Sequence, residues 1–110
     1  MRMMVEVLAN LFKRRATVLY PLEERRDAPA GFRGKLGFER DKCIGCRMCW
    51  RVCPAAAIDM VKDDKGVRPV FKIYRCIYCY QCVEVCPTKA IRPGGGYENI
   101  ALDKERLMVK

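Results

Sequence analysis

The first apolar residues of the chain are spaced as they would be on one face of an α-helix. They recur three to four positions apart, which gives an apolar stripe along a helix with 3.6 residues per turn. The stripe consists of Met3, Met4, Val7, Leu8, Leu11 and Phe12. Three basic residues follow at positions 13–15. We expect an amphipathic helix that docks onto a partner or membrane surface, in preference to a helix packed inside this chain.

Short apolar segments in the middle of the chain predict a small α+β unit. Segments 58–61 and 70–73 flank a turn-like stretch at 63–66 and predict a β-hairpin. Segments 37–40 and 90–92 are expected to supply matching edge strands. Segments 47–52 and 81–85 are expected to form single helical turns, each stopped by a proline, Pro54 or Pro87.

The chain of 110 residues is long enough for one domain with extensions. Prolines and glycines punctuate a polar stretch up to residue 35, which predicts an extended arm with few contacts of its own. The glycine run at 94–96 predicts a flexible joint. We therefore expect an N-terminal helix and docking arm over 1–35, a central domain over 36–93 and a C-terminal docking tail over 94–110.

The cysteines form an internal repeat with an offset of 33 residues. Four cysteines and a proline occur twice, as Cys43, Cys46, Cys49, Cys53 and Pro54, and again as Cys76, Cys79, Cys82, Cys86 and Pro87. Apolar residues repeat with the same offset: Ile44 with Ile77, Val52 with Val85, Ala57 with Ala90 and Ile58 with Ile91. Two copies are too few for a helical solenoid, so duplication of one metal-binding unit is the simpler interpretation.

Three cysteines two residues apart can present three thiolates from one tight loop, and a cubane cluster needs a fourth from elsewhere. The pattern occurs twice, so it predicts two [4Fe–4S] clusters as cofactors, held by all eight cysteines. The first residues do not resemble a secretory signal, so we expect the protein to stay in the cytoplasm. Thiols are kept reduced there, which argues against a disulfide framework and for cysteines bound to metal. Zinc is the main chemical alternative, but its Cys₄ sites use paired C-x₂-C units without a third cysteine.

The unit that contains the cysteines can bury little apolar surface, so the clusters are expected to serve as much of its core. The protein without clusters should then be largely disordered. The repeated apolar residues should form a shell around the clusters: Ile44, Ile58, Ile77, Val52, Val85 and Ile91. We expect Tyr78 and Tyr80 to join this shell by packing against a cluster face.

The net charge of +9 would favour an anionic partner, and two clusters at about −2 each would lower it by about four. The basic residues are scattered and not interleaved with exposed aromatics, which argues against nucleic acid as a partner.

Histidine is absent from the sequence. This excludes Rieske-type ligation, Cys₂His₂ fingers and histidine acid–base catalysis. No run approaches the ~18 apolar residues of a membrane-spanning helix.

The second cysteine run, residues 76–91, resembles the ferredoxin-like subunit of complex I and its relatives in membrane-bound hydrogenase and sulfane reductase complexes. Tyr20-Pro21, segment 31–34 and the tail at 97–109 resemble the flanks of that subunit. The family resemblance implies a bacterial two-[4Fe–4S] ferredoxin-like fold with a pseudo-two-fold repeat. In such ferredoxins the fourth cysteine of each run ligates the other cluster. The implied ligands are Cys43, Cys46, Cys49 and Cys86 for cluster 1, and Cys76, Cys79, Cys82 and Cys53 for cluster 2.

The resemblance further implies a non-catalytic electron-transfer subunit of a membrane-bound, complex I-like respiratory oxidoreductase. Complex I members have more residues between the two cysteine runs and commonly have glycine at the position of Tyr80. In both features the chain is more similar to the archaeal membrane-bound hydrogenase or sulfane reductase branch. We expect a ferredoxin-oxidising [NiFe] hydrogenase-type complex, with the chain peripheral on the cytoplasmic side of the cell membrane. Residues 1–15 would contact the membrane or membrane subunits.

Several alternatives remain open at this stage. The chain could be a subunit of an NADH-quinone or sulfane reductase complex, a ferredoxin-like subunit of a 2-oxoacid oxidoreductase, or a free ferredoxin. A zinc-binding structural or nucleic-acid-binding module is the alternative from a different functional class. A free ferredoxin would need neither the arm nor the tail, because the cysteine unit is complete without them.

Overall fold

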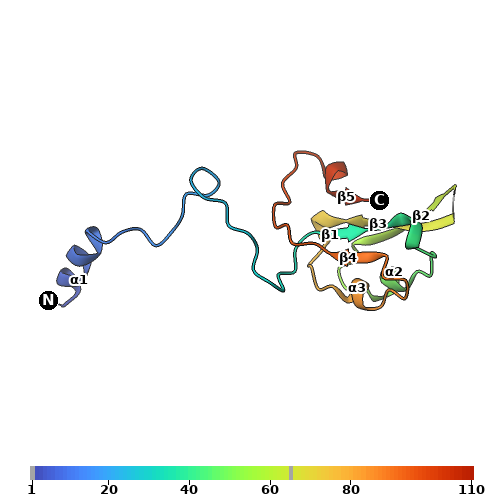
Figure 1. The fold of residues 1–110 in the computed structure, drawn as a ribbon, viewed down its shortest axis with the longest axis horizontal. Coiled ribbons are helices and arrows are strands. Elements are labelled where there is room, and N and C mark those ends of the chain that lie inside the picture. Colours follow the sequence, from blue (N-terminus) through green and yellow to red (C-terminus); the bar gives the residue numbers. More distant parts are fainter. Residues whose placement is uncertain (1, 65) are drawn as a thin grey trace.

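The computed structural model describes residues 2–64 and 66–110, which form a small domain at the end of a long arm (Figure 1). The extents of the chain are 70 × 25 × 22 Å. The predicted N-terminal helix is present as α1, Arg2–Leu11, at the far end of the arm. Among the described residues, no helix has the length and apolar character needed to cross a membrane.

Two small antiparallel sheets build the domain (Figure 1). In the first, β1 (Leu36–Phe38) pairs with β4 (Ile91–Pro93). In the second, β3 (Gly66–Lys72) lies between β2 (Ile58–Asp63) and β5 (Met108–Val109). The predicted hairpin and edge strands are therefore confirmed, although Lys65 of the expected turn lies outside the described residues.

Short helices precede and follow the first cysteines of each run. The 3-10 turn η1 (Arg40–Lys42) precedes Cys43, so Arg40 lies in this turn and not in the expected edge strand. The equivalent turn η2 (Ile73–Arg75) precedes Cys76. The predicted helical turns are present as α2 (Met48–Val52) and α3 (Gln81–Glu84). Another 3-10 turn, η3 (Lys104–Leu107), precedes β5.

The 33-residue repeat extends from the sequence into the backbone. Left-handed φ angles occur in equivalent pairs: 71° at Gly45 and 55° at Tyr78, 62° at Arg47 and at Tyr80, and 46° at Ala56 and 49° at Lys89. L-residues with side chains rarely adopt positive φ. Two pairs are exceptions in both halves, and in the third pair glycine stands opposite Tyr78. The matched conformations support the duplication, and the predicted α+β fold with a pseudo-two-fold repeat is confirmed.

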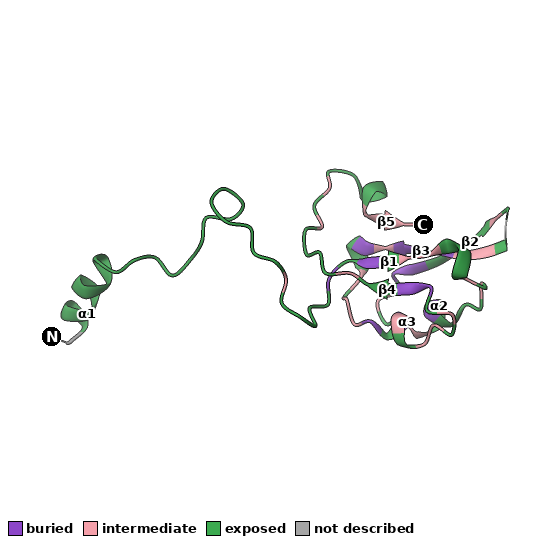
Figure 2. Cartoon of the chain, viewed as in Figure 1, coloured by how far each residue is buried: buried purple, intermediate pink, exposed green. Residues whose placement is uncertain are grey.

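The core lies entirely in the domain, whereas α1 and most of the arm are exposed (Figure 2). Its buried members are Leu36, Cys49, Ile58, Phe71, Ile73, Tyr80, Cys82 and Ile91. The residues of the expected apolar shell differ in exposure. Ile58 and Ile91 are 3% exposed, whereas Ile44 is 66% and Ile77 63% exposed. Each of these last two residues directly follows the first cysteine of a run, on a loop at the domain surface. There it lines a cysteine cavity, as the shell prediction required, without entering the buried core.

The C-terminal tail contacts both the arm and the second sheet. The backbone N–H of Lys35 donates to the Gly96 carbonyl at 2.8 Å. The Tyr97 hydroxyl donates to the Arg26 carbonyl at 2.7 Å, and Tyr20 hydrogen bonds Glu98. The last residues form β5 and complete the second sheet. The glycines at 94–96 thus serve as a place where arm and tail cross closely.

Candidate iron–sulfur sites

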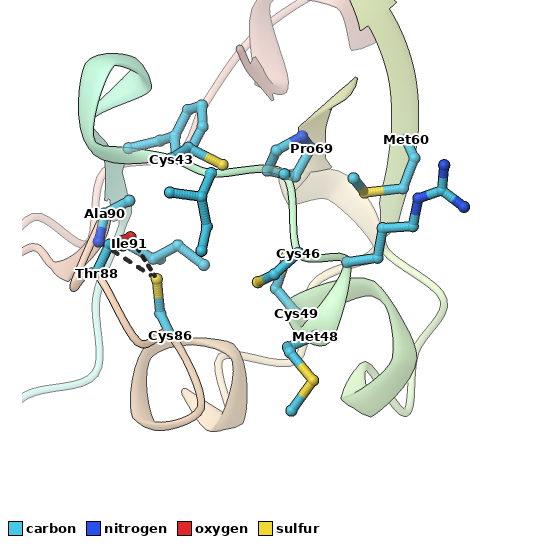
Figure 3. Close-up of a pocket in the computed structure, with 14 residues that line it drawn as sticks. Cys43, Cys46, Met48, Cys49, Met60, Pro69, Cys86, Thr88, Ala90 and Ile91 are labelled. Carbon is cyan, nitrogen blue, oxygen red and sulfur yellow. Dashed lines mark hydrogen bonds between the residues drawn. The ribbon is translucent and has the colours of Figure 1, made fainter. Parts of the chain in front are cut away.

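The first cavity of the domain is lined by Cys43, Cys46, Cys49 and Cys86 (Figure 3). Three of these cysteines come from the η1–α2 region, and Cys86 comes from the residues after α3. The space measures about 360 Å³ with its open mouth included. Apolar side chains from both sheets complete the wall: Phe38, Met60, Pro69 and Ile91. The structure thus gathers the first three cysteines of one run with the last cysteine of the other.

The second cavity is lined by the equivalent cysteines with the two runs exchanged. Cys76, Cys79 and Cys82 line it together with Cys53 from the first run. Its space of about 390 Å³, open mouth included, is close in size to the first. Leu36, Ile58, Phe71, Ile77 and Tyr80 are among the remaining wall residues. All eight predicted site residues therefore line one of two cavities, four in each.

Backbone N–H groups donate to the sulfur of the last cysteine in each run. Ala57 donates to Cys53 Sγ, and Ala90 donates to Cys86 Sγ, both at 3.3 Å. The left-handed turns before these alanines aim the N–H groups back at the sulfurs. Such donors stabilise a thiolate and are one of the levers on cluster reduction potential. Sequence reasoning missed them, although the alanines repeat with the same offset as the cysteines.

Burial raises the pKa of three of the cavity thiols. It raises the pKa of Cys49 to about 11 and that of Cys82 to about 12, and it also raises the pKa of Cys76. At Cys86 burial acts in the same direction, but hydrogen bonds from Thr88 and the backbone prevail and lower the pKa. Binding of a metal group to the buried cysteines must therefore displace protons.

The donor set fits two cubane clusters. Thiolates are soft ligands that suit iron–sulfur clusters, and each cavity offers four of them among apolar walls. Within residues 2–64 and 66–110, no three cysteine, aspartate or glutamate side chains lie close enough together to hold a single metal ion. The thiols surround a space instead, as ligands of a cluster do.

The fold and the cysteine sets define a domain with a ferredoxin-like fold and sites for two iron–sulfur clusters. Comparison with protein families gives the same result, because residues 42–90 match the model of the 4Fe-4S dicluster domain. The predicted cofactors, two [4Fe–4S] clusters, are thereby confirmed.

The chain is also similar to subunits of respiratory complexes. The chain is 41% identical over 66 residues to subunit I of the NAD(P)H-quinone oxidoreductase of Synechococcus sp. (strain JA-2-3B'a(2-13)), an alignment with 60% of this chain and 30% of the relative. It is 37% identical over 76 residues to subunit I of the NADH-quinone oxidoreductase of Cytophaga hutchinsonii, covering 63% of this chain and 43% of the relative. The aligned part is thus less than half of each curated relative.

A solved structure matches more of the chain. It is the membrane-bound sulfane sulfur reductase, an archaeal respiratory membrane complex, with a TM-score of 0.70 and 36% identity. The match covers 93% of this chain and 56% of the matched chain. The predicted resemblance to the ferredoxin-like subunit of complex I and to the sulfane reductase branch is confirmed.

Proposed function

We propose that the chain is an electron-transfer subunit of a membrane-bound respiratory complex related to complex I. The observation that carries this proposal is the extent of the likeness to the sulfane sulfur reductase chain. That likeness covers 93% of this chain, whereas the dicluster segment is residues 42–90. It therefore includes most of the arm and tail, which a freely diffusing ferredoxin would not need.

In this proposal each cluster is held in a crossed pattern, by the first three cysteines of one run and the fourth cysteine of the other. Cluster 1 is held by Cys43, Cys46, Cys49 and Cys86, and cluster 2 by Cys76, Cys79, Cys82 and Cys53. The grouping of these cysteines around two cavities supports the assignment. When bound, [4Fe–4S] clusters accept and release single electrons. The residues of the chain bind the clusters, exclude water from them and direct N–H groups at the sulfurs.

Residues 1–15 are the proposed contact with the membrane or with membrane subunits, on the cytoplasmic side. Every residue from 3 to 27 is exposed, including the whole apolar stripe of α1. An isolated helix of ten residues is marginal in water, so α1 needs a surface to be stable. The basic residues at 13–15 suit the anionic headgroups of such a surface. The helix and arm over 1–35, the ferredoxin domain over 36–93 and the docking tail over 94–110 remain our proposed division.

The terminal donor and acceptor define the finer part of the proposal. The named relatives are quinone oxidoreductases and a sulfane sulfur reductase, and these two types fit the chain. The ferredoxin-oxidising hydrogenase type stays a prediction from the sequence. In each case the substrate chemistry would belong to other subunits.

Membrane fractionation with a matched pair of helix variants tests complex membership. Leu11 belongs to the apolar stripe at the last position of α1 and is 74% exposed, and Ala9 is exposed on the opposite face of α1. Leu11→Glu should release the tagged chain from the membrane fraction, because a carboxylate cannot remain charged against an apolar surface. Ala9→Glu should leave the chain with the membranes in a large detergent-solubilised complex. A wild-type chain that migrates alone in the soluble fraction would contradict the proposal.

A further inference from the structure

Tyr80 occupies a left-handed position between two cysteines of the second cavity. Its φ is 62° and its ψ 9°, and the equivalent Arg47 in the first half has nearly the same values, 62° and 7°. Glycine would adopt this conformation freely, and a large side chain adopts it at a cost. The two side chains differ, because Arg47 is exposed whereas Tyr80 is 9% exposed in the core. The same backbone strain is thus present in both halves, but only at Tyr80 is the side chain packed into the core.

The Tyr80 hydroxyl reaches the end of the N-terminal arm. It donates a buried hydrogen bond of 2.7 Å to the carbonyl of Gly34, and the Gly94 carbonyl lies 3.5 Å away. The phenol ring lines the second cavity beside Cys79 and Cys82. A single side chain thus connects the wall of the cluster site with the arm and with the glycine run of the tail.

The arm and the tail cross at this hydroxyl with no room for a side chain. A Cβ at Gly34 would lie 2.4 Å from the Gly96 carbonyl oxygen, and a Cβ at Gly94 would lie 2.2 Å from that of Lys35. The hydrogen bond from Lys35 to Gly96 closes the same crossing. The backbone that accepts from Tyr80 is therefore held in one place.

Arg33 covers the same site from the outside. Its Nη1 donates to the Cys79 carbonyl at 3.1 Å, and its guanidinium carbon lies 6.0 Å from the centre of the Tyr80 ring. A cation at this distance from an aromatic face is attracted to it. The arm therefore contacts both the loop that carries Cys79 and a side chain in the wall of the cavity.

We propose that Tyr80 is a positioning residue that closes the second cysteine cavity beneath the end of the N-terminal arm. It thereby couples the placement of the arm to the reduction potential of the cluster held there. One-electron reduction adds a negative charge, which water stabilises better than an apolar wall does. Exclusion of water by Tyr80 and the arm therefore lowers the potential of cluster 2. The inference rests on the ligand sets proposed above.

A pair of tyrosine variants in the full chain with both clusters bound tests this inference. Tyr80→Phe keeps the ring and loses the bond to Gly34, whereas Tyr97→Phe loses an equivalent bond to the Arg26 carbonyl away from both cavities. Redox titration monitored by electron paramagnetic resonance should show that Tyr80→Phe raises the midpoint potential of one cluster and leaves that of the other unchanged. Trypsin should cleave after Arg33 or Lys35 about fivefold faster, as expected for the loss of one hydrogen bond. Tyr97→Phe should leave both potentials unchanged.

A variant on the arm side makes the test independent of Tyr80 itself. Gly34→Ala should displace the arm from the crossing and raise the same midpoint potential with Tyr80 intact. Unchanged potentials in Tyr80→Phe or in Gly34→Ala, with about eight irons still bound, would overturn the inference alone. An iron content that excludes two clusters in the wild-type chain would instead overturn the proposed function.

Discussion

Replacement of Cys53 by alanine should remove the cluster of the second cavity and spare the first. In the sequence Cys53 lies four residues after Cys49, but in the fold it lines the cavity of Cys76 and Cys79. Alanine has no ligand atom, so the second cavity would keep three of its four thiols. Iron should fall from about eight to about four per chain. The equivalent variant in the second run, Cys86→Ala, should remove the cluster of the first cavity and leave that of the second in place.

Double variants identify which cluster each cysteine holds, because substitutions in one site do not add whereas those in separate sites do. Cys53→Ala combined with Cys79→Ala should retain about four irons, since both affect one cluster. Cys53→Ala combined with Cys46→Ala should retain almost none. For Cys86→Ala the order reverses, with about four irons beside Cys46→Ala and almost none beside Cys79→Ala. Iron and sulfide are counted after anaerobic reconstitution, and the opposite pattern would refute the crossed assignment.

Three further predictions concern stability. Removal of the clusters by acid and chelator should abolish most of the β signal in circular dichroism, because the domain core is small and metal binding contributes to folding. Gly94→Ala should destabilise the cluster-loaded chain by about 1–3 kcal/mol, measured as a lower thermal midpoint, since its Cβ would overlap the Lys35 carbonyl. Gly95→Ala, which has open space, is the control and should leave the midpoint within experimental error. Ile91→Ala, at a position 3% exposed, should cost about 2–5 kcal/mol in the same assay.

The sequence predicted the parts of the fold that depend on short-range patterns. The apolar periodicity at 3–12 predicts α1, and alternating segments around a polar turn predict the β2–β3 hairpin. The prolines after each cysteine run mark where α2 and α3 end. The offset of 33 predicts the pseudo-two-fold repeat, which the paired left-handed residues reproduce. These features are local, so they need no knowledge of long-range contacts.

Long-range contacts account for what the sequence could not provide. The glycine run looks flexible in isolation, and only the crossing of arm and tail shows why a Cβ atom is excluded at Gly34 and at Gly94. β5 has two residues and no periodicity of its own, so its pairing with β3 is set by tertiary packing. Ile44 lines the first cavity, as the repeat predicted, but the repeat constrains its loop position and not its burial, and it is 66% exposed.

Tyr80 shows the same limit in the candidate site. Its aromatic character predicts packing near a cluster, and the structure places the ring in the wall of the second cavity. The sequence contains no sign of its bond to Gly34, which joins residues 46 positions apart. The cysteine grouping was predicted from the resemblance, because spacing alone leaves the source of each fourth thiolate open.

The central claim is that this chain holds two [4Fe–4S] clusters for electron transfer. Anaerobic iron and acid-labile sulfide analysis of the purified chain, with electron paramagnetic resonance after reduction, tests it most directly. The account predicts about eight irons and eight sulfides per chain and spin-coupled signals from two reduced clusters. Stoichiometric zinc without sulfide would contradict the account and indicate a structural or nucleic-acid-binding module.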